Sequence, residues 1–536
     1  MTHARILAAI TSVLVWTMAF SSTVACRDLG EVPAGGFRSP GITEYIFRNP
    51  REGWVYVRVP KPETVTSRLP IAVLDGAEIV LKAVDNGLEA MRYMSEGPHT
   101  VGITYGTVNR LEVRAIGELF YAAYGSNPHI PEMGNYTWAF LRRYCLNNFN
   151  GIIGDLTETA DGKMKQEAEI KEWTSEGKRW FTLTSAPDEI RVSKPANTAD
   201  EAIDYWTKNP GMTHPLISGV FGDEFGPRQA KYFPAWSEAL RRIHADPRFS
   251  SRKFYAYSPN RYWPLEEGYE VMFPFVRTIM DCGYRLVPEW YLVEGWSRPG
   301  RIIEKTKDLQ AEFGPEWEMA SRESFERASP GAATNRIVAV GILTEPGWEK
   351  SDLFAQYDFN VFLDCQIQFL ATDPAFFGTR GLQGYLSSYC GEEQLRLFAK
   401  LVRHYAIEGK IDRVLKDNYV LPHLQNPDFE KGLDGWTLSP AVSTKGKESI
   451  VPKTVPGFGT IQAKYHAPAG TGDKTLWTKR SSLKPNKVSQ KIRDLVPGRL
   501  YSLRFITGDY QEFLNGTSVK RKHALSVRIE NVELVT

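Results

Sequence analysis

The chain has few cysteines and almost no excess of charge of either sign. Five cysteines are spread over 536 residues, and Cys145, Cys282, Cys365 and Cys390 show no Cys-x-x-Cys or Cys/His spacing. This spacing argues against a zinc site and leaves open both buried free thiols and one or two disulfides. A formal net charge of +2 does not indicate a nucleic-acid partner. No Gly-rich phosphate loop, internal repeat or low-complexity linker is present, so we expect no cofactor and no metal.

Long apolar runs are also missing, apart from one at the N-terminus. A short charged segment (1–5) is followed by an apolar run (6–20) and small residues up to Ala25. This order is typical of a signal peptide, and the run is too short for a membrane span. We therefore predict a signal peptide over 1–25 and export of the protein, which is then secreted or held at the cell envelope. Cys26 is a candidate for a lipid anchor, although Thr23 stands where a leucine is usual.

The rest of the chain is long enough for several domains, and its periodicity changes twice. Residues 27–107 contain short alternating strands between Pro and Gly turns, which predicts an accessory N-terminal β-sandwich. In 108–415 apolar strand-like runs alternate with amphipathic helical ones, which is typical of a parallel α/β fold. Residues 424–536 alternate again without helical periodicity and predict a C-terminal β-sandwich. The expected fold class is multidomain, with a central (β/α)8 TIM barrel between two β-sandwich domains.

Eight strands are predicted for the central region, and this number favours a closed barrel over an open doubly wound sheet. They cover 111–121, 151–155, 179–186, 217–225, 253–260, 284–292, 336–345 and 378–389. In such a barrel the carboxyl ends of all strands meet at one mouth, where active sites lie. Side chains that follow different strands are therefore expected to lie close together.

Three of these strands end in carboxylates. Asp223 and Glu224 follow the fourth strand, Glu289 lies near the end of the sixth, and Glu345 ends the seventh. Two carboxyl groups across a cleft are the minimal machinery for cleaving a glycosidic bond, because one donates a proton and the other attacks or steadies the sugar cation. The proton donor needs a raised pKa, which burial or a neighbouring negative charge such as that of Asp223 or Glu289 provides.

A family resemblance follows from two of these carboxylates. Glu224 in Gly222-Asp-Glu-Phe225 and Glu345 in Leu343-Thr-Glu-Pro-Gly-Trp348 resemble the arrangement of the clan A (β/α)8 glycoside hydrolases. The resemblance implies that Glu224 is the acid/base, that Glu345 is the nucleophile, and that the anomeric configuration is retained. The clan usually has Asn before the fourth-strand glutamate, whereas this chain has Asp223, which indicates a divergent member. Glu289 is the main rival of Glu345 for the nucleophile.

A second resemblance lies in the C-terminal region. The segment that opens with Asn426-Pro-Asp-Phe-Glu and ends in Gly435-Trp436 resembles the first strand of carbohydrate-binding sandwiches attached to secreted glycosidases. The resemblance implies binding of a carbohydrate, and a plain spacer domain is the alternative.

Further candidates for substrate binding follow other strands. Asp155 and Asn260 come after the second and fifth strands, and Trp290 and Trp348 come after the sixth and seventh. Together with Asp223 and Glu289 they are predicted to contact substrate, since polar groups bind sugar hydroxyls and indoles stack on sugar faces. Helix capping by the polar residues and packing of the tryptophans under loops are the alternatives.

The function predicted from these patterns is a secreted retaining glycoside hydrolase that acts on a polysaccharide or oligosaccharide. One alternative is a catalytically inactive surface protein that binds glycans. Another is a lyase, or a hydrolase of a different bond, that uses Asp223 and Glu224 as a pair. For Glu224 itself, an ion pair with an arginine such as Arg228 is the simpler explanation. A carbohydrate is thus the expected partner, and the oligomeric state is left open.

Overall fold

The computed structural model describes most of the chain beyond the N-terminal segment. The described residues are 27–31, 38–39, 42–60, 72–84, 87–104, 111–124, 136–154, 165–259, 269–292, 296–298, 301–302, 309, 322–344, 352, 354–385, 387–444, 447–459, 470, 472–499, 501, 503, 505–517 and 525–532. Within them, no helix has the length and apolar character needed to cross a membrane. The predicted signal peptide and Cys26 lie outside the described residues, so export and the lipid anchor remain predictions.

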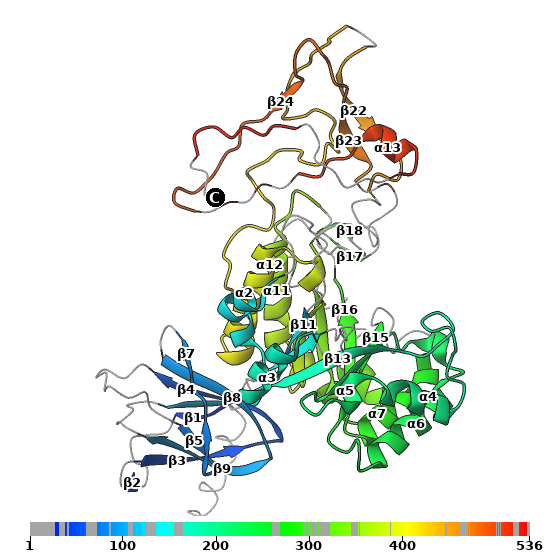
Figure 1. Cartoon of the computed structure of the whole chain (residues 1–536). Helices are drawn as coiled ribbons and strands as arrows, with labels where there is room; N and C mark the ends of the chain where they lie inside the picture. The colour runs from blue at the N-terminus through cyan, green and yellow to red at the C-terminus, as the bar shows by residue number, and fades with distance from the viewer. Residues whose placement is uncertain are drawn as a thin grey trace, which may run out of the picture. The chain divides into compact units, whose positions relative to one another are not determined.

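Contacts divide the chain into two compact units. The first comprises Met1–Glu345 and Phe359–Tyr419, and the second comprises Pro346–Asp358 and Val420–Thr536. The first unit contains an N-terminal pair of sheets and a closed barrel, and the described residues of the second form short antiparallel sheets and the helix α13 (Tyr510–Leu514) (Figure 1). The predicted multidomain fold class is confirmed.

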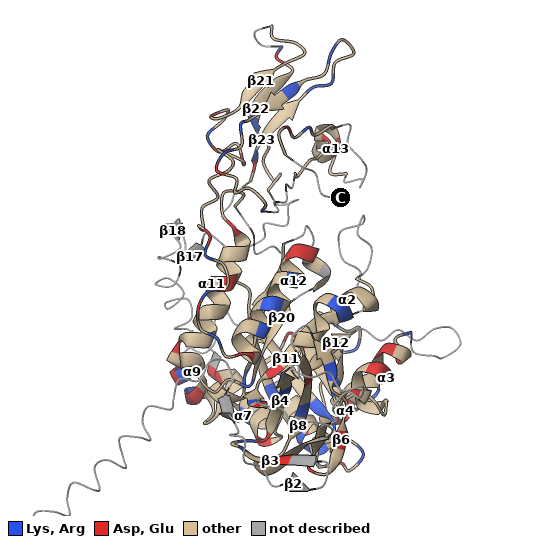
Figure 2. Ribbon diagram, turned by 90° about the vertical axis from the view of Figure 1, so that its left-hand side faces the viewer, with Lys and Arg blue, Asp and Glu red and all other residues tan. Residues whose placement is uncertain are grey.

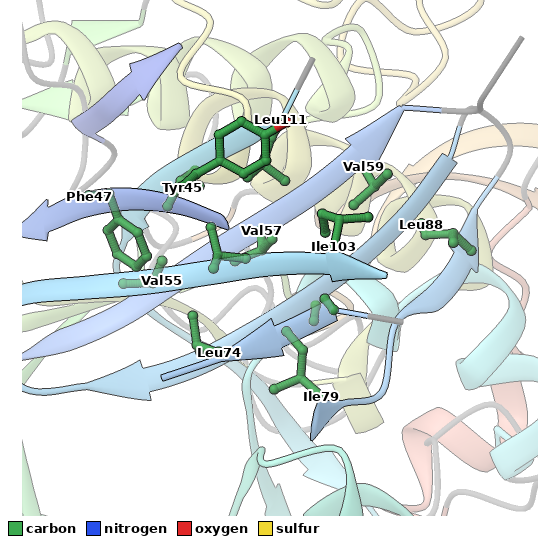
Figure 3. Close-up of a cluster of buried hydrophobic side chains, with 14 of the residues drawn as sticks. Tyr45, Phe47, Val55, Val57, Val59, Leu74, Ile79, Leu88, Ile103 and Leu111 are labelled. Carbon is green, nitrogen blue, oxygen red and sulfur yellow. The ribbon is translucent and has the colours of Figure 1, made fainter. Parts of the chain in front are cut away.

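The N-terminal strands form two five-stranded antiparallel sheets. In one sheet the order is β1 (Arg27–Glu31), β10 (Glu112–Ile116), β4 (Gly53–Pro60), β8 (Gly87–Met94) and β7 (Lys82–Val84). In the other it is β2 (Arg38–Ser39), β3 (Ile42–Asn49), β9 (Gly97–Thr104), β5 (Ala72–Leu74) and β6 (Ala77–Ile79). Val55, Val57 and Val59 alternate along β4 into a core shared by both sheets (Figure 3). The predicted N-terminal sandwich is confirmed.

Strand β4 is buried on its other face as well. Trp54 and Tyr56, which alternate with the core valines, are each 2% exposed. Arg403 of the barrel region donates to the Tyr56 hydroxyl and pairs with buried Glu89 at 2.6 Å, and the Arg179 guanidinium lies over the Trp54 ring. One face of this sheet therefore packs against the other sheet, and the opposite face packs against the barrel.

The predicted first barrel strand (111–121) is corrected by the structure. Glu112–Ile116 form β10 of the N-terminal sandwich, where Val113 pairs with Val57 of β4. After Gly117 the chain starts a separate strand, β11 (Glu118–Tyr124), which belongs to the barrel. The run of apolar residues is nearly continuous across both strands, so its composition alone did not reveal that the chain changes sheet at the glycine.

Eight parallel strands close into the predicted barrel. They are, in order around the ring, β11, β12 (Gly151–Gly154), β13 (Arg179–Ser185), β14 (Gly219–Asp223), β15 (Lys253–Pro259), β16 (Arg285–Trp290), β19 (Ile337–Gly341) and β20 (Gly381–Tyr385). Every residue of β12 and β19 is buried, as expected for parallel strands covered on both faces. The interior is filled by alternate side chains: Phe120, Ala122, Ile153, Phe181, Phe221, Tyr255, Tyr257, Val287, Ile337 and Ala339.

Helices surround the barrel between its strands. They are α2 (Trp138–Tyr144), α3 (Glu167–Ser175), α4 (Ala199–Thr207), α5 (Pro210–Thr213), α6 (Phe233–Ala245), α7 (Phe273–Asp281), α9 (Arg322–Ala328), α10 (Ala332–Asn335), α11 (Phe359–Thr372) and α12 (Glu392–Leu401), which continues as the π-helix η6 (Val402–Ile407). Helix α4 begins with a capping box between Thr198 and Glu201, and α6 buries Trp236, Leu240 and Ile243 at helical spacing. Basic and acidic residues are mixed over the helices in the view of Figure 2.

The second unit contains two short antiparallel sheets, one of β21 (Thr437–Ser439) with β24 (Lys487–Ser489) and one of β22 (Ile450–Thr454) with β23 (Lys474–Thr478), and the helix α13 (Tyr510–Leu514). The segment 426–436, expected as a first strand, is instead a series of turns. Asn426 has a φ of 45°, its carbonyl accepts a hydrogen bond from the Trp436 indole, and Phe429 stacks on that indole. Carbohydrate binding by this unit remains a prediction.

Candidate active site

A cavity of about 200 Å³ lies at the carboxyl ends of the barrel strands. Its lining comes from five strands and consists of Ala123, Leu183, Thr184, Ser185, Asp223, Tyr257 and Tyr385. Ser185, Asp223 and Tyr385 are the last residues of β13, β14 and β20. This is the end of the barrel at which the sequence placed the reaction.

Asp223 faces this cavity because of its position in β14. Side chains alternate along a strand, and Asp223 stands two residues after Phe221, which lies in the barrel interior. Burial raises the pKa of the Asp223 carboxyl to about 6, and the negative charge of Glu224 adds to the effect while Arg191 opposes it. A carboxyl group with this pKa is partly protonated near neutral pH and can act as a proton donor.

Glu224 occupies a different environment from its neighbour. It follows the last residue of β14 with a φ of 68°, in the left-handed region that residues other than glycine rarely adopt. Both carboxylate oxygens bind arginines, with Arg191 Nη2 2.5 Å from Oε1 and Arg228 Nη2 2.8 Å from Oε2. The ion pair with Arg228 that the sequence suggested as the simpler explanation is present, and the lining of the 200 Å³ cavity does not include Glu224.

Arg191 connects the two adjacent carboxylates. Its Nη1 lies 3.7 Å from Asp223 Oδ2 while its Nη2 binds Glu224. The loop that carries Arg191 is held by Asp188, which accepts hydrogen bonds from the Arg191 backbone N–H and from the Gln229 amide. The loops after β13 and β14 thus form one hydrogen-bonded network beside the mouth.

Glu289 is a second carboxylate at the carboxyl end of the barrel, and its place in the strand turns it toward the barrel axis. Like Glu224, it is not among the residues that line the 200 Å³ cavity. It lies two residues after Val287 of the barrel interior, and the Tyr291 hydroxyl donates to Glu289 Oε1 at 2.7 Å. The Tyr291 ring stacks on Tyr385 with centroids 4.8 Å apart. The glutamate is therefore oriented by a tyrosine that is itself fixed by stacking at the mouth.

Tyr257 lies between the two carboxylates. Burial raises the pKa of Tyr257, and the charges of Glu289 and Asp223 add to this effect. The Gln383 amide donates a hydrogen bond to that hydroxyl. Asp223, Tyr257 and Glu289 come from the neighbouring strands β14, β15 and β16, which places them side by side on the rim.

The remaining predicted site residues have different outcomes. Glu345, Trp348, Asp155 and Asn260 lie outside the described residues, and their roles remain predictions. Trp290, which was expected to stack on a sugar, is 4% exposed, and its ring contacts Phe376 of the 3-10 helix η4 (Pro374–Phe376) at 5.8 Å. These contacts favour the alternative interpretation, packing in the hydrophobic layer.

Several site residues had not been selected from the sequence. Tyr257, Tyr291 and Tyr385 are simple members of predicted strands, and their spacing of two from other interior residues is the signal that would have identified them. Arg191 lies in an irregular loop and carried no such signal. Three tyrosines of the predicted strands therefore lie at the mouth.

Metal ligation finds no support in the part of the chain that the structure describes, where no group of three His, Cys, Asp or Glu side chains could hold an ion. Cys145, Cys282, Cys365 and Cys390 are buried free thiols. Burial raises the pKa of Cys145 to about 12 and that of Cys282 to about 11, so neither is a ready nucleophile.

No family model matches the chain. No curated protein matches it either. Among solved structures, a class V chitinase from Pseudomonas fluorescens Pf-5 is 13% identical with a TM-score of 0.35, and the match covers 53% of this chain and 99% of that one. A chitinase from Pseudoalteromonas aurantia is 10% identical with a TM-score of 0.35, over 53% and 99% of the two chains.

A β-galacturonidase from Eisenbergiella tayi is 9% identical with a TM-score of 0.32, and the match covers 72% of this chain and 96% of that one. These likenesses are distant and concern the fold alone. The chain's own strand order shows the closed eight-stranded parallel barrel that the resemblance to (β/α)8 glycoside hydrolases implied.

Proposed function

We propose that the protein is a glycoside hydrolase whose reaction takes place at the carboxyl end of the barrel, with Asp223 and Glu289 as the two carboxylates. The observation that carries this proposal is the half-buried carboxyl group of Asp223, with its pKa raised to about 6, in a cavity at the mouth. Glycosidases need one carboxyl group that is protonated at working pH and a second that is ionised. Glu289, on the other side of Tyr257, supplies the second.

Asp223 acts as the general acid in this proposal. Its proton passes to the glycosidic oxygen as the bond between that oxygen and the anomeric carbon breaks, and the sugar alcohol leaves. The carboxylate left on Asp223 then accepts a proton from the water that completes hydrolysis. Glu224 and Arg191 set the proton affinity of Asp223 through their opposite charges, so Glu224 is a positioning residue here.

Glu289 faces the developing positive charge on the sugar ring. The hydrogen bond from Tyr291 fixes the orientation of its carboxylate, and the tyrosine stack supports that position. If Glu289 attacks the anomeric carbon, the configuration is retained, as the family resemblance implies. The assignment drawn from that resemblance, with Glu224 as acid/base and Glu345 as nucleophile, is the competing form of the proposal.

The ion pairs of Glu224 favour Asp223 over Glu224 as the acid. Both oxygens of Glu224 are occupied by guanidinium groups, which compete with transfer of a proton to substrate. Export of the enzyme through the predicted signal peptide belongs to the same proposal, because polysaccharides are processed outside the cell.

The test is release of reducing ends from a panel of polysaccharides and oligosaccharides by purified protein. Asp223→Asn and Glu289→Gln should each lower turnover by a factor of about 10² to 10⁴ without loss of folding. Asp246→Asn and Glu238→Gln are matched controls, since both residues form exposed ion pairs on or just after α6. Their turnover should equal that of the wild type.

Two results would change the proposal. Full activity of Asp223→Asn together with inactive Glu224→Gln and Glu345→Gln would transfer the reaction to the pair named by the family resemblance. A wild-type protein that retains glycans but releases no reducing ends would replace the hydrolase by the alternative function, a glycan-binding protein.

A further inference from the structure

A second and larger cavity adjoins the one at the mouth. It has a volume of about 620 Å³ and lies between the end of β13 and helix α4. Leu183, Thr184 and Ser185 line both cavities, so the two meet at the end of β13. The rest of its lining consists of Lys194, Pro195, Ala196, Glu201, Asp204, Tyr205, Lys208 and Asn209.

Three hydroxyl groups on these walls are available to a ligand. The side chains of Thr184, Ser185 and Tyr205 make no hydrogen bond to any residue that the structure describes. Each can donate and accept one, which matches the hydroxyl groups of a sugar. The ring of Tyr205, on α4, also gives this cavity an apolar surface.

Charges on the walls of the larger cavity cancel in pairs. Lys194 Nζ lies 3.4 Å from Glu201, and Lys208 Nζ lies 2.6 Å from Asp204. Two cations and two carboxylates leave no excess of either sign for binding a charged ligand. At the mouth the three carboxylates of Asp223, Glu224 and Glu289 outnumber the two guanidinium groups of Arg191 and Arg228, and both arginines already pair with Glu224, which disfavours an anionic sugar there.

We propose that the substrate is an uncharged glycan chain that occupies both cavities, with the bond to be cleaved at Asp223 and further sugar units extending over the end of β13 toward Tyr205. For the reaction, this inference rests on the proposed function. For the extended binding, it rests on Leu183, Thr184 and Ser185, which line both cavities. The larger cavity lies within the size range of pockets that enclose a whole small ligand, so it has room for units beyond the one at the mouth.

The experiment separates binding from cleavage by measuring both. Titration calorimetry is done with oligosaccharides of increasing length from chitin, cellulose and xylan, and with oligogalacturonides as anionic probes. Wild-type protein and Asp223→Asn should both bind one neutral series with affinity that increases with length. Oligogalacturonides of equal length should bind at least about tenfold more weakly.

Variants of the free hydroxyls test the location. Thr184→Val and Tyr205→Phe should each weaken binding of the longer chains by about tenfold and leave the shortest binding member unchanged. Thr207→Val and Tyr144→Phe are matched controls, because the Thr207 hydroxyl bonds within its own helix and neither residue lines either of the two cavities described above. Thermal melting confirms that all four variants are folded.

Each outcome supports or overturns the inference. Affinity that does not increase with length, an equal loss in the control variants, or no binding of any neutral series overturns it. Length-dependent binding that Tyr205→Phe abolishes, in a protein that cleaves nothing, supports the extended site and refutes the hydrolase. Cleavage that is lost in Asp223→Asn but unchanged in Thr184→Val and Tyr205→Phe supports the hydrolase and refutes the extended site.

Discussion

A carboxylate lies at each end of the barrel, buried at the amino end and half-buried at the carboxyl end, and the two differ in the charges around them. At the amino end, Glu118 of β11 is paired with Arg285 Nε at 2.8 Å and accepts a hydrogen bond from Tyr255. At the carboxyl end, Asp223 has Glu224 as its neighbour and only a distant contact with Arg191 at 3.7 Å. The two residues have the same chemical group in the same barrel.

Their proton affinities move in opposite directions. Burial by itself raises the pKa of Glu118, yet the charges of Arg285 and Arg179 and the bond from Tyr255 bring that pKa below its ordinary value. Burial and Glu224 instead raise the pKa of Asp223 to about 6. Burial is thus common to both, and the neighbouring charges decide whether a carboxylate stabilises the fold or stays ready to exchange a proton.

The largest expected effect is at the amino end. Glu118→Gln leaves Arg285 buried without its counter-ion and should lower the free energy of unfolding by about 3 to 5 kcal/mol. Urea unfolding measures this, with Glu238→Gln as the control. Activity per folded molecule should not change, because Glu118 is far from the mouth along its strand. A variant with normal stability would mean that the pair contributes no net stability.

Asp223→Asn should have the opposite effect on stability. Above pH 6 it removes a half-buried charge whose nearest cation, Arg191, is 3.7 Å away and is shared with Glu224, so the free energy of unfolding should rise by about 1 to 3 kcal/mol while catalysis is lost.

The pH dependence of stability sharpens this contrast. The Asp223 pKa is raised from 3.8 to about 6, so its contribution to stability is complete below about pH 4 and is lost as the pH rises through 6. The Glu118 pKa is lowered from 4.5, so its contribution is present above that pH and is lost as the pH falls through its native pKa. The free energy of unfolding is measured from pH 3 to 8. Its decrease as the pH rises through 6 should be absent in Asp223→Asn, and its decrease at acidic pH should be smaller in Glu118→Gln. Unchanged slopes would contradict the assigned charges.

Glu224→Gln should have an intermediate effect, on activity rather than stability. It removes a negative neighbour and frees Arg191, and both changes lower the pKa of Asp223. If Asp223 is the acid, the alkaline side of the profile of kcat/KM against pH should move down by about one pH unit. Arg228→Gln, which removes only the outer partner of Glu224, is the control and should move it less. A complete loss of activity at every pH would instead favour Glu224 as the acid/base.

The smallest expected effect compares two tyrosines on β15. Tyr255→Phe removes a hydrogen bond to the charged Glu118 and should cost about 2 kcal/mol, whereas Tyr257→Phe removes a bond between neutral groups with Gln383 and should cost about 1 kcal/mol. Thermal and urea unfolding of both variants give the difference. If the two variants lose equal stability, the amino and carboxyl ends of the barrel do not differ in the strength of these hydrogen bonds, and the contrast drawn between them is wrong.

Much of the fold could be predicted because strand and helix periods are local properties. The barrel strands β12, β13, β14, β15, β16, β19 and β20 all fall within predicted ranges. The exception, 111–121, is where one apolar run serves two sheets on either side of Gly117. Nothing in local periodicity reports which sheet a strand joins, since that depends on partners distant in the sequence.

The sequence by itself determined that carboxylates follow strands four and six of a parallel barrel and that these ends meet at one mouth. Only the tertiary structure decided which of the adjacent residues Asp223 and Glu224 faces the cavity. The reason is physical: a change of one position at the end of a strand turns a side chain from the barrel interior toward the loops. There Arg191 and Arg228, from separate segments, bind Glu224, while Asp223 is half-buried with a raised pKa.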